Sequence, residues 1–313
     1  MTEHPRANVL RVINTLAEDY LQGKVKAIKL ALIALLSGGH LLLEDIPGLG
    51  KTTLALALSR SLGLSFGRVQ CTSDLLPSDI TGLSVFNRDG NHFDFIKGPV
   101  FNNLLLADEI NRAMPKTQSA LLEAMEERRV TVEGTTYNLP SPFMVIATQN
   151  PVEQVGTYPL PESQLDRFLI KTGIGYPPES MEKIIIQAGS VRDSIRDITP
   201  LITAEQLMTA RRMVHADVHL SEKITDYIYQ LVKETRRHPM LVAGISTRGA
   251  ISLAETARAY AFLEERDYVI PEDIKTLFGP VCAHRLILRA DAETLDRKEL
   301  LQSLLDDLPV PLA

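Results

Sequence analysis

The sequence predicts an α/β protein built on a parallel sheet and followed by an all-helical domain. Over the first half of the chain, short apolar segments alternate with longer segments of helical periodicity. This order is typical of a parallel sheet covered by helices. A stiff connection at Tyr176-Pro177-Pro178 ends the alternation. Because only helical periodicity continues beyond about Met181, we place a domain boundary after residue 178.

The chain is expected to begin with two helices. Apolar residues recur at helical spacing between Ala7 and Ser37, with an interruption near Gln22-Gly23. Gly38-Gly39 then ends the second helix. We therefore assign three parts to the chain: an N-terminal helical segment over residues 1–36, an α/β core over 37–178 and a helical domain over 179–313.

Three buried strands are expected in the core. The segments from His40 to Glu44, Leu104 to Ala107 and Phe143 to Thr148 are short, apolar and bounded by turn residues. The first of them enters a Gly- and Pro-rich turn, after which Lys51 to Leu62 forms a helical pattern without a breaker. The local order is therefore strand, loop, helix.

Two further segments of the core predict β-hairpins inserted upon the sheet. Leu83 to Phe95 turns at Asp89-Gly90, and Val130 to Leu139 turns at Glu133-Gly134. In the second domain, Pro200, Ser221 and Pro271 are expected helix starts, since proline and serine suit the first positions of a helix. That domain is expected to be all-helical.

Composition narrows the possible functions. The 313 residues carry a net charge of −6 with a pI near 5.7, which argues against a surface that binds nucleic acid through its phosphates. Neither export nor membrane insertion is expected, because the longest apolar stretch contains Lys29 and the amino terminus has no apolar core. Cys71 and Cys282 are far apart and are expected to be buried thiols in the cytoplasm.

The loop after the first strand nearly fits the Walker A pattern of phosphate-binding loops. Gly48 and Gly50 let successive amides face a phosphate, Lys51 can reach the terminal phosphates, and the Thr52 hydroxyl can hold Mg²⁺. Asp45 stands where the pattern has its first glycine, so its carboxylate must point away from a phosphate. The expected nucleotide-binding set also includes Pro47, Leu49 and Thr53. The alternative is a Gly-rich turn before a structural helix.

Polar residues end the next two expected strands. Asp108 and Glu109 follow Leu104 to Ala107 in a Walker B pattern, in which Asp108 orients hydrated Mg²⁺ and Glu109 polarises the attacking water. Asn150, after the third strand, can lie between Glu109 and the γ-phosphate and position that water. The alternatives are an acidic first turn of a helix at Asp108 and a plain turn at Asn150-Pro151.

Together these residues resemble the bacterial MoxR-type AAA+ ATPases, of the helix-2-insert clade that also contains magnesium chelatase motor subunits and minichromosome maintenance helicases. The resemblance covers about Gly23 to Leu288. It implies a P-loop NTPase core, a parallel sheet in three αβα layers with β-hairpin insertions, followed by an all-α lid. The stretches that carry it are Ser37-Gly-Gly-His-Leu-Leu-Leu-Glu-Asp-Ile-Pro-Gly-Leu-Gly-Lys-Thr, Leu106-Ala-Asp-Glu-Ile-Asn-Arg-Ala, Leu121-Leu-Glu-Ala-Met-Glu-Glu-Arg, Thr148-Gln-Asn-Pro and Asp166-Arg167-Phe168.

The resemblance also implies roles for residues that the sequence alone leaves open. Asn150 corresponds to sensor 1, and Arg167 to the arginine finger inserted into a neighbouring subunit's ATP site. Taken alone, Arg167 is better interpreted as a surface or salt-bridged arginine. Arg248, in Gly244-Ile-Ser-Thr-Arg248-Gly249, resembles sensor 2, and Gly23 falls in the segment that lies along the adenine. Such proteins also commonly lack the loop glycine that Asp45 replaces.

The function implied by the resemblance is ATP hydrolysis with Mg²⁺ by a chaperone-like remodeller. Its subunits form a homo-oligomeric ring, a hexamer, act on a protein client and work with a von Willebrand factor A-domain partner. Three alternatives stay open: a magnesium-chelatase-like motor subunit, a nucleotide-dependent binding switch with little turnover, and a nucleic-acid motor. The acidic balance and the lack of an appended nucleic-acid-binding module speak against the last of these.

Overall fold

The computed structural model describes residues 4–152, 155–189, 192–292 and 294–311. Its centre is a five-stranded parallel sheet with the strand order β2-β5-β8-β1-β9. The strands are β1 (Leu41–Glu44), β2 (Phe66–Gln70), β5 (Leu104–Asp108), β8 (Met144–Gln149) and β9 (Ile170–Thr172). The three strands expected from the sequence are therefore the three inner ones, with β5, β8 and β1 side by side.

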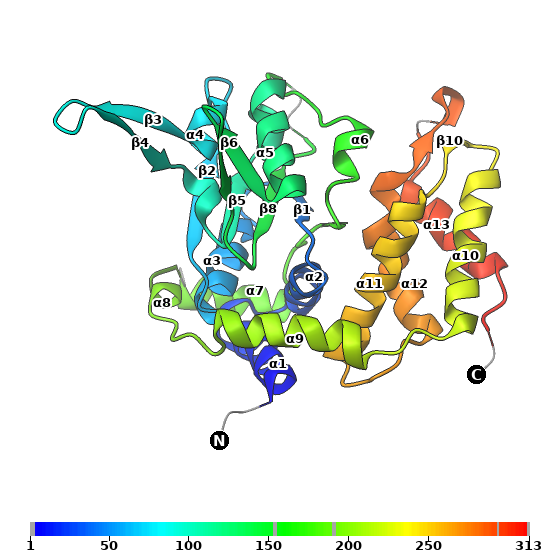
Figure 1. The fold of residues 1–313 in the computed structure, drawn as a ribbon. Coiled ribbons are helices and arrows are strands. Elements are labelled where there is room, and N and C mark those ends of the chain that lie inside the picture. Colours follow the sequence, from blue (N-terminus) through cyan, green and yellow to red (C-terminus); the bar gives the residue numbers. More distant parts are fainter. Residues whose placement is uncertain (1–3, 153–154, 190–191, 293, 312–313) are drawn as a thin grey trace.

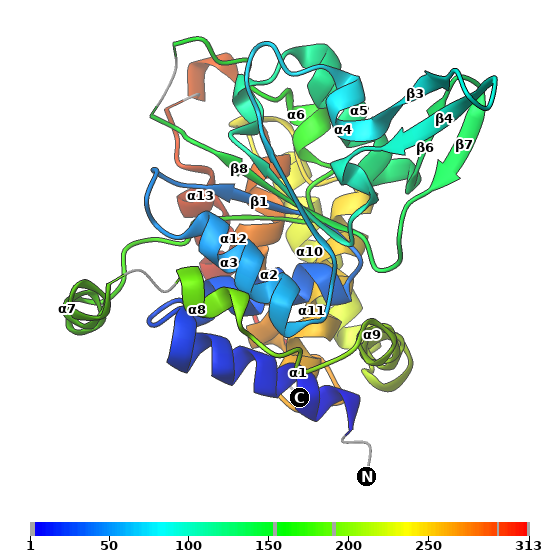
Figure 2. The ribbon, with the colours of Figure 1, turned by 90° about the vertical axis from the view of Figure 1, so that its left-hand side faces the viewer.

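Alternate side chains of the inner strands enter two separate cores. Leu41 and Leu43 pack in one core with α2 (Val25–Leu36) and α3 (Lys51–Ser61). Leu42 packs on the opposite side of the sheet, in the core that includes α5 (Pro115–Glu127). Figure 2 shows α5 above the sheet and α2 and α3 below it. Burial on both faces explains the continuous apolar runs of these strands and confirms the three-layer architecture.

Both expected hairpins are present. The first is formed by β3 (Gly82–Asn87) and β4 (His92–Lys97), after the short helix α4 (Pro77–Thr81), and extends away from the body of the protein (Figure 1). The second is formed by β6 (Arg129–Val132) and β7 (Thr135–Asn138). The two are joined where Phe95 stacks on Tyr137, with ring centroids 4.1 Å apart.

The second half of the chain is mostly helical, with α7, α8 and α9 below the core in Figure 1 and α10 to α13 forming the helical lid on the right. Helix α10 begins after Ser221, whose side chain accepts a hydrogen bond from Ile224 N, and α12 begins at Pro271, as expected. The lid helices and those leading to them are α6 (Glu162–Leu165), α7 (Glu179–Ala188), α8 (Arg192–Arg196), α9 (Ala204–Asp217), α10 (Glu222–Arg237), α11 (Thr247–Leu263), α12 (Pro271–Cys282) and α13 (Arg297–Asp307). Short 3-10 turns lie at Pro99–Phe101, Ile110–Arg112, Ala283–Arg285 and Ala290–Ala292.

The N-terminal helices connect the core to the lid. Helix α1 (Pro5–Thr15) continues into a π-helical turn, Leu16–Tyr20, and packs against α9 and α11. Helix α2 packs against the same two helices and also contributes to the core beside β1. The chain reverses between α1 and α2 at Gly23, which has a φ of +74°. The domain boundaries at residues 36 and 178 stay predictions.

Some details of the sequence analysis were wrong or incomplete. Pro200 does not start a helix; α9 starts after Thr203, whose hydroxyl accepts from Gln206 N and so satisfies an exposed amide of the first turn. Strands β2 and β9 were not expected. The lid also contains a small antiparallel ribbon of β10 (Leu241–Ala243) and β11 (Ile287–Leu288). Among the described residues, no helix has the length and apolarity needed to cross a bilayer.

Candidate nucleotide site and arginine cluster

The loop between β1 and α3 has the geometry that its glycines predict. Gly48 has a φ of +89° and Gly50 a φ of +94°, conformations that residues with a Cβ atom rarely adopt. A Cβ atom added at Gly48 would meet no other atom within 4 Å, so the loop is open on that side. The backbone therefore turns sharply before α3 begins at Lys51, with open space beside Gly48. Thr52 and Thr53, both half-buried, lie in the first turn of that helix.

Lys51 lies over this loop. Its Nζ atom donates hydrogen bonds to the carbonyl oxygen of Asp45 and to that of Ile46, the latter at 3.2 Å. Burial lowers the pKa of Lys51, while the negative charges of Asp45, Asp108 and Glu109 raise it. A buried ammonium held by loop carbonyl oxygens, beside an open curl of amides, fits a polyphosphate.

The side chain of Asp45 points away from the loop. Its Oδ2 atom accepts hydrogen bonds from the amides of Ile174, at 2.9 Å, and Gly175, at 2.7 Å. Its Oδ1 atom accepts one from the amide of Ile46 at 3.0 Å. The Asp45 carboxylate, which stands where the pattern has a glycine, is thus hydrogen-bonded to the backbone of the connector from β9 to α7.

Asp108 ends β5 at the same edge of the sheet. Its Oδ1 atom accepts a hydrogen bond from the Thr148 hydroxyl at 2.6 Å, and its Oδ2 atom forms an ion pair with Arg68 at 2.8 Å. Only 12% of the side chain of Asp108 is exposed, so Arg68 supplies a positive charge to a largely buried carboxylate. The position of Mg²⁺ predicted from the sequence is next to this carboxylate.

Glu109 is held by two side chains in a strained backbone conformation. Its φ is +57°, which is uncommon outside glycine and asparagine. Its Oε2 atom accepts from Gln70 Nε2 at 2.9 Å and from Arg112 Nη1 at 3.1 Å, while its amide donates to the Thr148 hydroxyl at 2.8 Å. The carboxylate that is expected to polarise water is therefore already engaged.

One partner of each carboxylate lies on β2, a strand that the sequence did not predict. In the register of β2 and β5, Arg68 lies opposite Leu106, and Gln70 lies opposite Asp108. Recognising β2 would have placed both at the carboxyl edge of the sheet, because parallel strands end at the same edge. Cys71, the next residue, is buried as expected, and burial raises the pKa of its thiol to about 12.

Asn150 follows β8, the strand between β5 and β1. It is buried, and its Oδ1 atom accepts a hydrogen bond from Val152 N at 3.2 Å. The amide of Asp45 donates to Gln149 O at 3.1 Å, which ties the start of the phosphate loop to the end of β8. The loop, the two acidic residues and Asn150 are thus brought to one edge of the sheet, as predicted from their order in the chain.

Gly23 lies against the connector that Asp45 holds. A Cβ atom at Gly23 would be 2.5 Å from Pro178 Cδ, so this close approach requires glycine. The next residue, Lys24, donates from Nζ to the carbonyl oxygen of Gly175. The N-terminal helices therefore meet the phosphate-loop side of the core through residues 175–178.

Arg167 and Arg248 lie together but away from this edge. Arg167, after α6, contacts Glu126 Oε2 at 2.8 Å, and Arg248, at the start of α11, contacts Glu126 Oε1 at 3.2 Å. Both line a hollow of about 200 Å³ with Gly39 and His40, which immediately precede β1. The phosphate loop follows the other end of β1. Four residues of strand separate the two regions by about 13 Å.

The sequence and the fold match a known class of protein. Residues 40–170 match the family described as "ATPase family associated with various cellular activities (AAA)", and residues 233–304 match the AAA lid domain. A crystal structure of a protein from Cytophaga hutchinsonii superposes with a TM-score of 0.90 and 38% identity, covering 98% of this chain and 96% of the other. The architecture is that of an AAA+ ATPase with a helical lid.

Relatives define the family further. YeaC of Bacillus subtilis is 47% identical over 93% of this chain and 91% of its own length. The chaperone MoxR1 of Mycobacterium tuberculosis is 42% identical over 86% of this chain and 73% of its own length. The chain belongs to the MoxR family of AAA+ ATPases.

Proposed function

We propose that this chain binds Mg²⁺-ATP and hydrolyses it within a homo-oligomeric ring, a hexamer, in the cytoplasm. The observation that carries the proposal is the convergence of the Lys51 loop, Asp108, Glu109 and Asn150 at the carboxyl edge of one sheet. Each side chain belongs to a type that phosphoryl transfer requires, and their elements are those of an AAA+ core.

The residues divide the work of binding. The amides from Gly48 to Thr53, which follow Pro47, and the ammonium of Lys51 bind the phosphates. Gly23, packed against Pro178, belongs to the segment that lies along the adenine. Thr52 and Asp108 hold Mg²⁺, which when bound neutralises charge on the phosphate oxygens. Asp108 already forms an ion pair with Arg68, so its surroundings favour the charged carboxylate that Mg²⁺ requires.

Two further residues act on the attacking water. Glu109 polarises it, and Asn150 fixes its position in line with the γ-phosphate. Gln70 and Arg112 both bond to Oε2 of Glu109, so these contacts set the orientation of the carboxylate and leave Oε1 to accept from the water. A partner or client that changes these contacts can control turnover.

Arg167 and Arg248 act on the nucleotide of a neighbouring protomer. Their contacts with Glu126 place them at the amino edge of the sheet, while their own phosphate loop follows the carboxyl end of β1. A guanidinium supplied across a subunit boundary stabilises transition-state charge and can accelerate phosphoryl transfer by about 10³-fold or more. This arrangement supports a finger role for Arg167 and a sensor 2 role in trans for Arg248.

Mixed rings test this division directly. Glu109→Gln and Arg167→Ala should each hydrolyse ATP poorly, and turnover of the wild type should rise with protein concentration as rings assemble. Mixing the two variants should restore activity, because an Arg167→Ala protomer keeps an intact site that a Glu109→Gln neighbour can complete. Equal activity in all three proteins, or no recovery upon mixing, would contradict the mechanism.

The chaperone-like role is supported by the name of MoxR1 and by the exposed hairpin. Phe86, Phe93 and Ile96 of β3 and β4 expose 47%, 62% and 56% of their surface, respectively, an apolar patch typical of a protein-contact site. We propose that the client, or a von Willebrand factor A-domain partner, binds there. Pull-down with Glu109→Gln in ATP, with and without Phe93→Ser, tests this. Tight ATP binding without phosphate release in any partner's presence would instead favour a nucleotide switch.

A further inference from the structure

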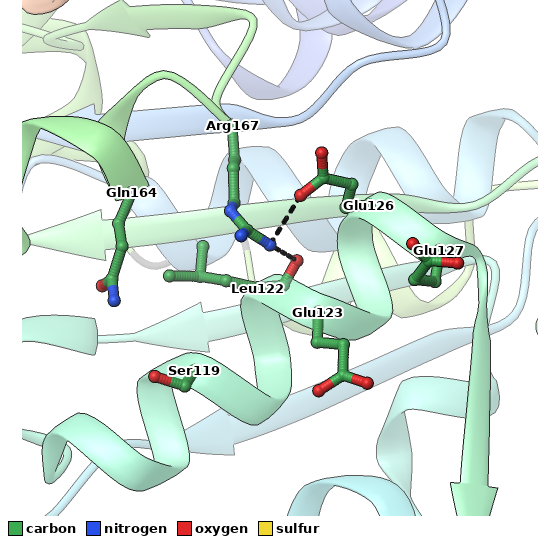
Figure 3. Close-up of a pocket in the computed structure, with 7 residues that line it drawn as sticks. All are labelled: Ser119, Leu122, Glu123, Glu126, Glu127, Gln164 and Arg167. Atoms are coloured by element: carbon green, nitrogen blue, oxygen red, sulfur yellow. Dashed lines mark hydrogen bonds and ion pairs between the residues drawn. The ribbon is translucent and has the colours of Figure 1, made fainter.

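One carboxylate joins the two arginines that the proposed function assigns to the neighbouring site. Figure 3 shows Arg167 directed toward Glu126 and the carbonyl oxygen of Leu122. Glu126 Oε2 accepts from Arg167 Nη1 at 2.8 Å, and Glu126 Oε1 accepts from Arg248 Nη1 at 3.2 Å. Each oxygen of the carboxylate therefore serves a different arginine.

The contacts orient Arg167 without using up its donors. Arg167 Nη1 donates both to Glu126 and to Leu122 O, the latter at 2.9 Å. A guanidinium has five N–H donors, and both contacts made by Arg167 within the described part of the chain use Nη1, so the groups on Nη2 and Nε remain for a phosphate oxygen. Glu126 and Leu122 thus fix the plane of the guanidinium and leave one side of it for a ligand.

The two hollows that Arg167 lines differ in charge. The one on the side of Glu123 and Glu127 has three carboxylates, these two and Glu126, beside the single guanidinium of Arg167. The other is lined by Glu126, Asp166 and four arginines, Arg128, Arg167, Arg248 and Arg285, so its guanidinium groups outnumber its carboxylates by two. His40, in the same lining, adds none at neutral pH, because burial lowers its pKa to about 3. An anionic group from outside the protomer fits this excess.

The cluster also crosses from the core to the lid. Glu126 lies near the end of α5 in the core, and Arg248 lies in the first turn of α11 in the lid. Asp166 makes a parallel link, since its Oδ1 atom accepts from Arg285 Nε at 2.7 Å. Arg285 is only 3% exposed in its side chain, whereas Glu126 is 38% exposed and Arg248 54%. Asp166 and Arg285 are therefore the fixed part, and Glu126 with its arginines is the accessible part.

We infer that Glu126 is a positioning residue that presents Arg167 and Arg248 as one unit to the anionic phosphate of a neighbouring protomer's nucleotide. The inference rests on the proposed function. Without Glu126, the contacts left within the described residues are one anchor of Arg167, at Leu122 O, and the distant ion pair of Arg248 with Asp166 at 3.9 Å. Two flexible guanidinium groups that repel each other are then presented in many orientations.

The test compares Glu126→Ala and Glu126→Gln with a matched control, Glu127→Ala. Glu127 follows on the same helix, is 50% exposed and pairs with Arg129 at 3.0 Å. For assembled rings we expect kcat to fall roughly tenfold to hundredfold in Glu126→Ala. The fall should be smaller in Glu126→Gln, which keeps one acceptor oxygen, and absent in Glu127→Ala. Binding of a fluorescent ATP analogue by unassembled protomers should not change, because the protomer's own phosphate loop lies at the other edge.

A double-mutant cycle separates positioning from general damage. In the Arg167→Ala, Arg248→Ala background, Glu126→Ala should cause no further loss of kcat, because it acts only through those two residues. An additive loss, or an unchanged kcat in both Glu126 variants while Arg167→Ala is impaired, would overturn the inference and leave the proposed function intact. A wild type without turnover, or Arg167→Ala as active as the wild type, would overturn both.

Discussion

Replacing Asp45 by alanine should free the connector between β9 and α7. The Asp45 carboxylate accepts two backbone amides of that connector, from Ile174 at 2.9 Å and Gly175 at 2.7 Å. Hydrogen bonds to a charged group contribute about 1.5 to 3 kcal/mol each. Asp45 is half-buried, so we take the lower value, because water can replace part of what is lost. The two bonds together then hold the connector by about 3 kcal/mol.

Hydrogen exchange measures this contribution locally. A loss of about 3 kcal/mol in the opening free energy corresponds to a roughly hundredfold faster exchange of the Ile174 and Gly175 amides. Asp45→Asn should give an intermediate rate, since its amide oxygen can accept one of the two bonds. The Leu169 amide, which donates to His40 O at 2.9 Å, is an internal control and should not change. If the Ile174 and Gly175 amides of Asp45→Ala exchange as slowly as those of the wild type, the Asp45 carboxylate does not hold the connector.

Two other predictions follow from buried and engaged groups. Burial lowers the pKa of His40 from 6.5 to about 3, so between these pH values His40 is protonated in the unfolded chain and neutral in the folded protein. The free energy of unfolding should therefore have its full value above pH 6.5 and fall by about 1.4 kcal/mol per pH unit below it. Urea unfolding at pH 6 and pH 5 should therefore show a smaller loss in His40→Asn than in the wild type. Gln70→Ala removes one bond to Glu109 and should raise basal phosphate release up to about tenfold, and an unchanged rate would show that Arg112 alone holds the carboxylate.

The parts of the fold that could be predicted are those with a local signal. Strands β1, β5 and β8 are buried on both faces, so their side chains are apolar up to the polar residues at their carboxyl ends, and each run stands out from its turns. The edge strand β2 buries only Gly67 and Val69 fully, between half-buried or exposed residues, and β9 has only three residues. Two buried positions, one of them glycine, do not distinguish a strand from a loop.

The same distinction applies to the candidate site. The Lys51 loop and the pair Asp108-Glu109 could be identified because each lies next to a strand in the sequence. The contacts of Arg68 with Asp108 and of Gln70 with Glu109 join residues about forty positions apart, and they depend on the register of β2. A sequence shows such a pairing only when both strands have been recognised. The helix start expected at Pro200 failed for a local reason, since Thr203 offers a hydroxyl to the first amides of α9 and Pro200 cannot.

The phosphate loop and the hollow that Arg167 lines are at opposite ends of β1, and this separation bears on how protomers can assemble. β1 is paired on one side with β8 and on the other with β9, so its length fixes the distance between the phosphate loop and the hollow that Arg167 lines. A two-fold dimer brings one surface patch against its own copy, whereas the proposed function requires the loop of one protomer to meet the arginines of another. In an open row of protomers, such a head-to-tail contact leaves one phosphate loop unused at one end and one arginine cluster unused at the other. Closing the chain into a ring completes every site, which is why activity should depend steeply on protein concentration.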